Sequence, residues 1–185
     1  MRSSKKNEKD LVFLEHIAII YLMDTIFAPW RIAYIRAEKR EGCVLCRDSL
    51  RGDELVVHEG KSCFVTVNRY PYTGGHLMIV PYRHLSSLTD LLQEERLEVF
   101  SFMDLSIRVL TEAMKPQGFN IGMNLGKAAG AGIDDHLHLH VVPRWGGDTN
   151  FMSVIGGVRV IPEDVTGTAK ELRSFFERFH REVSG

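Results

Sequence analysis

The sequence has few cysteines, no long apolar run and almost no net charge, and each shortage excludes a class of protein. Three cysteines in 185 residues, an odd number, are not the disulfide framework of a small secreted protein. The one membrane candidate, residues 11–23, is about half the length of a spanning helix and contains Glu15 and His16. A formal net charge of −1 gives no overall field that would attract nucleic acid or an anionic membrane. We therefore expect a cytoplasmic protein with neither as a partner.

The length and the 44% hydrophobic content suit one globular domain with a buried core. We expect this domain to cover residues 24–185. Residues 1–23 are interpreted as an N-terminal extension, either disordered or amphipathic, or as an artefact of start-codon choice if translation begins at Met23.

Hydrophobic periodicity predicts an α+β fold. Five short β-like runs, several bounded by Gly or Pro, predict strands over 54–58, 62–68, 76–82, 119–124 and 136–144. A long helix is expected over Thr89–Met114, with Thr89 as its N-cap, and a C-terminal helix over Thr168–Val183. The core-facing stripe of the long helix is expected to be Leu92, Val99, Phe100, Met103, Ile107, Leu110 and Met114. Short connections favour an antiparallel sheet that the long helix crosses.

Three histidines, His136, His138 and His140, alternate with apolar residues in the last predicted strand. In a β-strand alternate side chains share one face, so the imidazoles would lie in a row about 7 Å apart, with the apolar residues on the other face. A solvated surface strand would also accept histidines, but it would not need the apolar alternation. The pattern therefore indicates a row of ligands or nucleophiles above a core.

Cys43 and Cys46 form a C-x-x-C pair whose spacing lets two thiolates bind one metal ion. A redox dithiol and two chance cysteines are the alternatives, although redox pairs usually begin a helix after a strand. Suitable further ligands are His84, at the end of the third predicted strand, and one histidine of the triplet. Such a Cys₂His₂ site has no open coordination position and would be structural.

The run Gly126–Gly132, just before the histidines, is rich in Gly and Ala and contains Lys127. Small residues let backbone N–H groups approach an anion closely, and Lys127 would add charge. A phosphate held there would face His138, and Asn124 could hydrogen-bond a phosphate or sugar oxygen. By itself the run is more often only a turn.

Together these features resemble the histidine-triad (HIT) superfamily of nucleotide hydrolases and transferases. Its signature, three histidines alternating with apolar residues, is matched from His136 to Val142. The chain is most similar to the bacterial branch that includes diadenosine tetraphosphate phosphorylases, from Ala28 to the C-terminal helix. Runs similar to that branch lie at 67–72, 75–81, 118–120 and 142–148.

The resemblance implies cleavage of dinucleoside polyphosphates through a nucleotidyl-histidine formed on His138, while His140 hydrogen-bonds the phosphate or leaving group. It implies that Asn68 contacts the ribose. In zinc-bearing relatives the first triad histidine completes the metal site, which implies a structural zinc here. The implied zinc ligands are Cys43, Cys46, His84 and His136. The expected nucleotide-binding residues are Asn68, Asn124, Lys127, Gly130, Gly132 and His140.

Other residues have two interpretations. His76 is either an orienting histidine behind the triad or a satisfied core residue, Asn68 would also suit a turn, and Cys63 is read as a small buried hydrophobe. Trp30 and Trp145 would line the substrate mouth or the dimer seam, although such rings more often serve only packing. Relatives commonly have a hydroxyl or amide donor before the triad, whereas this chain has Asp134 and Asp135, which makes phosphorolysis less secure than the general chemistry.

Two other functions remain open, a nucleoside phosphoramidase and a non-enzymatic nucleotide-binding module. HIT relatives pair by joining their sheets and long helices, so we also expect a homodimer. The apolar residues off the main stripe would supply the second buried face of the long helix, on a partner or, as the alternative, under a C-terminal segment folded over it: Leu91, Leu97, Phe102, Leu105 and Val109.

Overall fold

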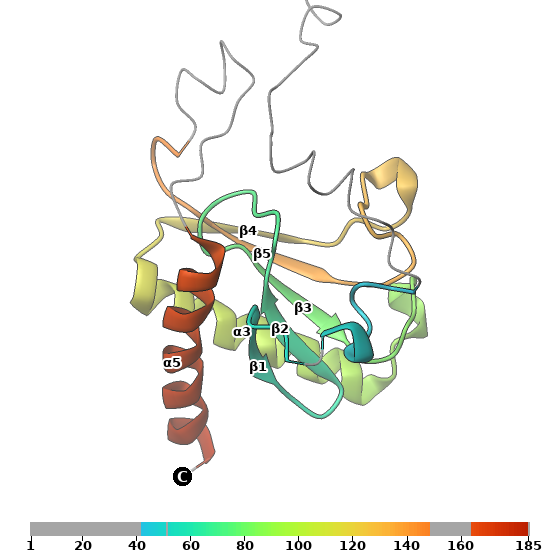
Figure 1. The fold of residues 1–185 in the computed structure, drawn as a ribbon, viewed down its shortest axis with the longest axis horizontal. Coiled ribbons are helices and arrows are strands. Elements are labelled where there is room, and N and C mark those ends of the chain that lie inside the picture. Colours follow the sequence, from blue (N-terminus) through green and yellow to red (C-terminus); the bar gives the residue numbers. More distant parts are fainter. Residues whose placement is uncertain (1–41, 51, 149–163, 185) are drawn as a thin grey trace, which may run out of the picture. The chain divides into compact units, whose positions relative to one another are not determined.

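The computed structural model of the protein describes residues 42–50, 52–148 and 164–184, all within one compact unit of the chain. The unit is an open five-stranded antiparallel sheet with two long helices (Figure 1). The predicted α+β fold is confirmed. Residues 1–23, the boundary at residue 24 and Trp30 lie outside the described residues, so the predicted domain limits stay predictions.

The sheet contains every predicted strand. The strands are β1 (Val56–Glu59), β2 (Cys63–Val67), β3 (Leu77–Pro81), β4 (Gly118–Gly122) and β5 (Leu139–Arg144), in the spatial order β1-β2-β3-β5-β4. One boundary differs in a way that affects the site, because β5 begins at Leu139 and not at His136. The N–H of Leu137 donates to the carbonyl of Leu85, in the loop after β3, at 2.6 Å. His136 and His138 therefore precede the regular ladder.

The long helix α3 (Gln93–Met114) begins later than predicted. Thr89 lies in a short 3₁₀ helix, η2 (Leu88–Asp90), and is not the N-cap. The N-cap is Leu92, whose N–H donates to the carboxylate of Glu95 at 2.8 Å. The C-terminal helix α5 (Val165–Ser184) agrees with the prediction and begins three residues earlier, where the Asp164 carboxylate accepts the N–H groups of Thr166 and Gly167.

The core-facing stripe of α3 was predicted correctly only in part. Val99 and Leu110 are buried, and Met103, Ile107 and Met114 pack against the core, as expected. Phe100 and Leu92, expected in the core, are 64% and 49% exposed, whereas Phe102, expected on the outer face, is 8% exposed. The fully buried Ser106 lies in the true stripe and interrupts its apolar pattern. A count of apolar residues therefore favours the neighbouring stripe. The buried residues of α3 are Glu95, Val99, Phe102, Ser106, Val109 and Leu110.

The two faces of the sheet have separate cores. One packs against α3 and α5 and includes Val65, Ile79 and Val141, together with Phe102 and Phe176. The other is a smaller cluster of Leu45, Phe64, Met78 and Val80. Across β3 and β5, Met78 pairs with His140, which places His140 on the face opposite the helices.

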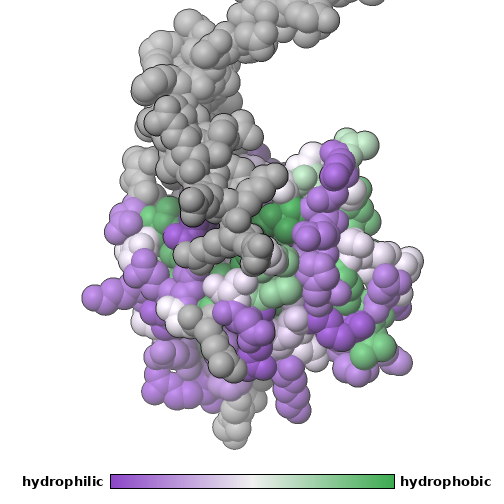
Figure 2. All heavy atoms as spheres, turned by 45° about the vertical axis from the view of Figure 1, so that its right-hand side comes forward, coloured by the Kyte–Doolittle hydropathy of each residue, from purple (hydrophilic) through white to green (hydrophobic). Residues whose placement is uncertain are grey.

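One face of the described surface can be followed by its hydropathy. Hydrophilic side chains dominate the face shown in Figure 2, with apolar ones between them. In the described part of the chain, no helix combines the length and apolarity that crossing a bilayer requires.

Candidate active site and metal centre

The proton of His138 has a fixed position. His138 Nδ1 lies 2.8 Å from the carbonyl oxygen of His136, and because a carbonyl only accepts, Nδ1 must carry the hydrogen. In the neutral ring Nε2 then has a free lone pair. His138 is 7% exposed, so this lone pair is held in a largely dry environment. The arrangement suits a nucleophile.

The proton of His140 is fixed through a second histidine. The backbone N–H of Tyr72 donates to His76 Nδ1 at 3.0 Å, so the proton of neutral His76 is on Nε2. His76 Nε2 lies 2.9 Å from His140 Nδ1 and donates to it, which leaves the His140 proton on Nε2. His140 Nε2 is buried and has no hydrogen-bond partner among the described residues. A buried N–H without a partner is costly, and an anionic ligand would satisfy it.

The environment keeps both imidazoles neutral. Burial, followed by the neighbouring His140 and His138, lowers the pKa of His76 to about 3. Burial, followed by His138, lowers the pKa of His140 to about 4. Near neutral pH His140 is therefore a neutral N–H donor. The Tyr72 ring stacks on His76 with centroids 4.7 Å apart and shields the pair.

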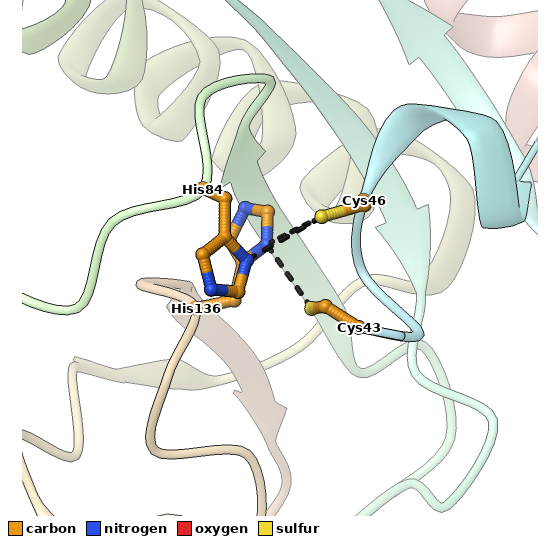
Figure 3. A group of neighbouring side chains, drawn as sticks. All are labelled: Cys43, Cys46, His84 and His136. Atoms are coloured by element: carbon orange, nitrogen blue, oxygen red, sulfur yellow. Dashed lines mark hydrogen bonds between the residues drawn. The ribbon is translucent and has the colours of Figure 1, made fainter. Parts of the chain in front are cut away.

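The four predicted metal ligands lie together. One ligand atom from each of Cys43, Cys46, His84 and His136 falls within 4.8 Å of the others. Figure 3 shows the two imidazoles facing the two sulfurs, with His84 from the loop after β3 and the cysteines from the loop that leads into η1 (Arg47–Leu50). Cys43 Sγ is 3.3 Å from His136 Nδ1, and Cys46 Sγ is 3.4 Å from His84 Nδ1.

The protonation of this cluster suits a metal ion. His136 Nε2 donates to the carbonyl of Pro81 at 2.9 Å, so the lone pair of Nδ1 faces the sulfurs. Burial raises the pKa of the Cys43 thiol, although the N–H of Leu45 donates to its sulfur and opposes that shift. Two thiols and two imidazoles form the donor set that zinc prefers.

The loop that carries His84 is anchored to α3. Arg83 donates two hydrogen bonds to the Glu95 carboxylate, at 2.6 and 2.7 Å, and a third to the carbonyl of Asp90. Glu95 is buried, and its pKa is lowered chiefly by the hydrogen bond from Arg83. Asp135 lies on the far side of His84, with its Oδ2 4.0 Å from His84 Nε2. This carboxylate therefore lies beside the His84 ring nitrogen that does not face the sulfurs.

The glycine-rich loop is built around the 3₁₀ helix η3 (Lys127–Ala129). Lys127 is 85% exposed at its side chain and lies 3.6 Å from Asp134, so its charge is already paired. Gly130, at φ +82°, donates its N–H to the carbonyl of Lys127. Gly132 is exposed. The phosphate-binding role of this loop stays a prediction.

The two asparagines differ. At the end of β2, Asn68 accepts the N–H of Tyr70 at Oδ1, as in an Asx turn, and its Nδ2 lies 3.3 Å from His76 Nδ1. Its local contacts therefore agree with the turn interpretation and link it to the histidines. Asn124 is half-buried after β4, and within the described residues no hydrogen bond to its side chain is found.

The remaining sequence candidates are placed by packing. Cys63 is fully buried in β2, as predicted. The indole N–H of Trp145 donates to the Met114 carbonyl at 3.3 Å, at the C-terminal end of α3, which gives it a structural contact. His76 fits both of its interpretations, since it is fully buried and orients His140.

Sequence reasoning missed groups that belong to the backbone. The carbonyls of Pro81 and His136 and the N–H of Tyr72 fix the site's tautomers, and no residue type is needed for these roles. A cavity of about 740 Å³, lined among others by Arg47, Tyr82 and Arg173, includes none of the triad histidines. The site is therefore recognised by its hydrogen bonds.

Known proteins are similar to this chain in sequence and in fold. A model of the HIT domain family matches residues 51–147. An AP-4-A phosphorylase of Mycobacterium tuberculosis (strain ATCC 25618 / H37Rv) is 48% identical over 124 residues, which are 67% of this chain and 64% of that protein. The alignment thus spans less than two thirds of that relative.

One further relative and one solved structure are also similar to this chain. A bis(5'-adenosyl)-triphosphatase of Saccharomyces cerevisiae (strain YJM789) is 32% identical over 93 residues, 50% of this chain and 45% of that protein. The crystal structure of a Zn-bound histidine triad family protein from Mycobacterium smegmatis has a TM-score of 0.62 at 29% identity, covering 76% of this chain and 97% of that one. The family model covers more than half of the chain, and the resemblance predicted from the sequence is confirmed: the chain belongs to the HIT family.

Proposed function

We propose that the protein is a nucleotidyl hydrolase or transferase that cleaves dinucleoside polyphosphates through His138. The observation that carries the proposal is the bond from His138 Nδ1–H to the His136 carbonyl, which leaves the Nε2 lone pair free. The names of two relatives, an AP-4-A phosphorylase and a bis(5'-adenosyl)-triphosphatase, support this substrate class.

In the first step His138 Nε2 attacks the α-phosphorus. A P–N bond forms, the P–O bond to the polyphosphate breaks, and the polyphosphate leaves with the bonding electron pair. The N–H of His140 Nε2 hydrogen-bonds a phosphate oxygen as charge develops there. In the second step water or phosphate attacks the nucleotidyl-histidine and restores the imidazole.

Substrate is held by the groups around the histidines. Asn68 and Asn124 contact the ribose and a phosphate, and the loop with Lys127, Gly130 and Gly132 lies beside the polyphosphate. Asn124 is suited to this because no described residue occupies its amide. Lys127 would exchange Asp134 for a phosphate oxygen.

Zinc is the metal that the donor set fits, held by Cys43, Cys46, His84 and His136. With four protein ligands it supplies structural support and no Lewis acidity toward the substrate. All three cysteines are free thiols, which suits the reducing cytoplasm that we propose as the protein's location.

We also propose a homodimer. Phe100 and Leu97, one turn apart on α3, are 64% and 63% exposed, and β4 lies at one edge of the sheet. The other edge strand, β1, is covered differently, because Arg173 donates to the carbonyls of Glu54 and Val56. Pairing through α3 and β4 would bury the exposed apolar residues and an open edge.

The decisive experiment is product analysis with diadenosine tetraphosphate, with and without inorganic phosphate. ADP and ATP formed only with phosphate identify a phosphorylase, and AMP and ATP formed without it identify a hydrolase. Turnover of an adenosine phosphoramidate in place of the dinucleotide identifies a phosphoramidase. Nucleotide binding without turnover of any of these substrates contradicts the enzyme proposal.

A further inference from the structure

His136 belongs to two sites at once. Its Nδ1 lies 3.3 Å from Cys43 Sγ in the metal cluster, and its carbonyl oxygen accepts the proton of His138 Nδ1 at 2.8 Å. We propose that the Cys43/Cys46/His84/His136 cluster acts on catalysis as well as on the fold, because it fixes the tautomer of His138 through the backbone of His136. This inference rests on the proposed role of His138.

The argument begins with where the strand starts. β5 begins at Leu139, so the His136–His138 segment has no regular ladder to hold its carbonyls in place. Its backbone is tied by one bond, from the Leu137 N–H to Leu85. The remaining anchors belong to the His136 side chain. Its Nε2 donates to the Pro81 carbonyl, and its Nδ1 faces the sulfurs of Cys43 and Cys46.

The second anchor depends on the cluster being filled. Without a metal ion the cysteines offer His136 at most weak hydrogen bonds, since sulfur is a poor partner. A metal ion bound by Cys43, Cys46 and His84 would also bind the His136 imidazole and hold it in place. The backbone carbonyl of the same residue would then be held as well. Misplacing a catalytic group by about 1 Å can cost roughly 100-fold in rate, so a small rotation of this carbonyl would affect turnover.

The consequence is specific to His138. When its Nδ1–H loses the His136 carbonyl, the proton is free to move to Nε2, and the lone pair then points away from the substrate. His140 should be unaffected, because its tautomer depends on His76 and Tyr72. Removing the metal should therefore change one imidazole of the pair and leave the other alone.

The test uses the full-length protein labelled with ¹⁵N-histidine, loaded with zinc or stripped by a chelator. Ring-nitrogen spectra, assigned with His138→Asn and His140→Asn, report each tautomer independently of activity. With zinc, His138 should show only the Nδ1–H form, and without it a mixture, while His140 keeps the Nε2–H form. The kcat for diadenosine tetraphosphate should fall at least roughly tenfold, with KM changing much less.

Two variants separate this effect from a general loss of stability. His84→Ala removes an exposed ligand and leaves the other three, so we expect it to weaken metal binding in a chain that still folds. Glu98→Gln weakens the turn between β1 and β2, away from His136, and should lower stability without altering the His138 tautomer.

An unchanged His138 tautomer in folded, metal-free protein overturns the inference. So does a mixture of His138 tautomers in Glu98→Gln, or a finding that every zinc-deficient form is unfolded. If the tautomer responds to zinc but the loaded enzyme cleaves no dinucleotide, the positioning effect stands and the proposed function fails.

Discussion

At the scale of the residue, the histidines of the site differ because a different neighbour places the proton of each. His136 donates to Pro81, His138 to His136, and His76 to His140, which fixes a bare nitrogen on two rings and a free N–H on a third. Under the proposed function, one amino acid type would thereby supply a metal ligand, a nucleophile and a hydrogen-bond donor. In each ring, the hydrogen bond made by one nitrogen decides whether the other nitrogen carries a lone pair or a proton.

His138→Ala should reduce kcat at least about 10³-fold while nucleotide binding survives, because the covalent step loses its nucleophile. Turnover of diadenosine tetraphosphate and calorimetric binding of a non-hydrolysable analogue measure the two effects. His180→Ala, an exposed histidine of α5, is the matched control and should remain active. Near-normal turnover by His138→Ala would show that the nucleophile lies elsewhere.

His76→Ala should lower kcat by up to about 100-fold, since His140 loses the donor that holds its proton on Nε2. KM should change less, because the pocket remains. Steady-state kinetics measure both quantities. If His76→Gln loses as much kcat as His76→Ala, the result argues against a tautomer-specific role.

The same histidines predict how stability depends on pH. Their folded-state pKa values, about 3 for His76 and about 4 for His140, lie below the ordinary value of 6.5, so the unfolded chain binds protons that the folded chain does not. The free energy of unfolding should therefore fall as pH drops from about 6.5 toward 4 and be retained above that range. Urea titrations should show a weaker pH dependence for His76→Ala, and equal slopes for both proteins would contradict the assignment.

Residue types were the part of the site that the sequence could predict. Cys43, Cys46, His84 and His136 meet as expected, because their spacing and chemistry are written in side chains. The hydrogen bonds of the Pro81 carbonyl to His136 and of the Tyr72 N–H to His76 could not be predicted. Nearly every residue has such backbone groups, and only the fold decides where they point. Lys127 was predicted to add charge near a bound phosphate, whereas its pairing with Asp134 depends on the path of the loop.

At the scale of the element, strands were easier to predict than boundaries and phases. All five strands exist, but the last one was predicted to begin at His136, because histidines and apolar residues alternate from there. The β5 hydrogen-bond ladder starts only at Leu139. Alternation describes which residues are buried, and here the first two histidines are buried by loop contacts instead. In α3 the buried Ser106 interrupts the apolar core stripe, and the prediction placed the exposed Phe100 in that stripe in place of the buried Phe102.

Glu98 joins two elements and should matter for stability. Its carboxylate accepts the N–H groups of Lys61, Ser62 and Cys63, which clamps the turn between β1 and β2 to α3. Burial would raise the pKa of Glu98, but these bonds outweigh it and lower the pKa. Glu98→Ala should cost about 1–3 kcal/mol of stability, measured by urea unfolding at pH 7. Exposed Glu94→Ala is the control, and equal losses would contradict the clamp.

At the scale of the whole molecule, an apolar surface on α3 is exposed among the described residues. Phe100 and Leu97 project from the side of α3 that faces away from the core, where Phe102 and Val109 lie. Large exposed apolar side chains one turn apart on a helix are typical of an interface. The sequence predicted a second buried face on this helix, and that face stays a prediction, now with Phe100 in it in place of the core residue Phe102.

The last prediction follows from that change. Phe100→Glu should convert a dimer of twice the 21.0-kDa chain mass into a folded monomer, because a charge in the interface would be buried without a partner. Phe102→Glu should unfold the chain instead, since Phe102 packs in the core. Ser174→Glu, which adds the same charge to an exposed site on α5, should leave the mass unchanged. Light scattering at micromolar concentration measures the mass and circular dichroism the fold. Wild-type protein at the monomer mass would refute the dimer, and a Phe100→Glu variant that stays dimeric would place the interface away from this face of α3.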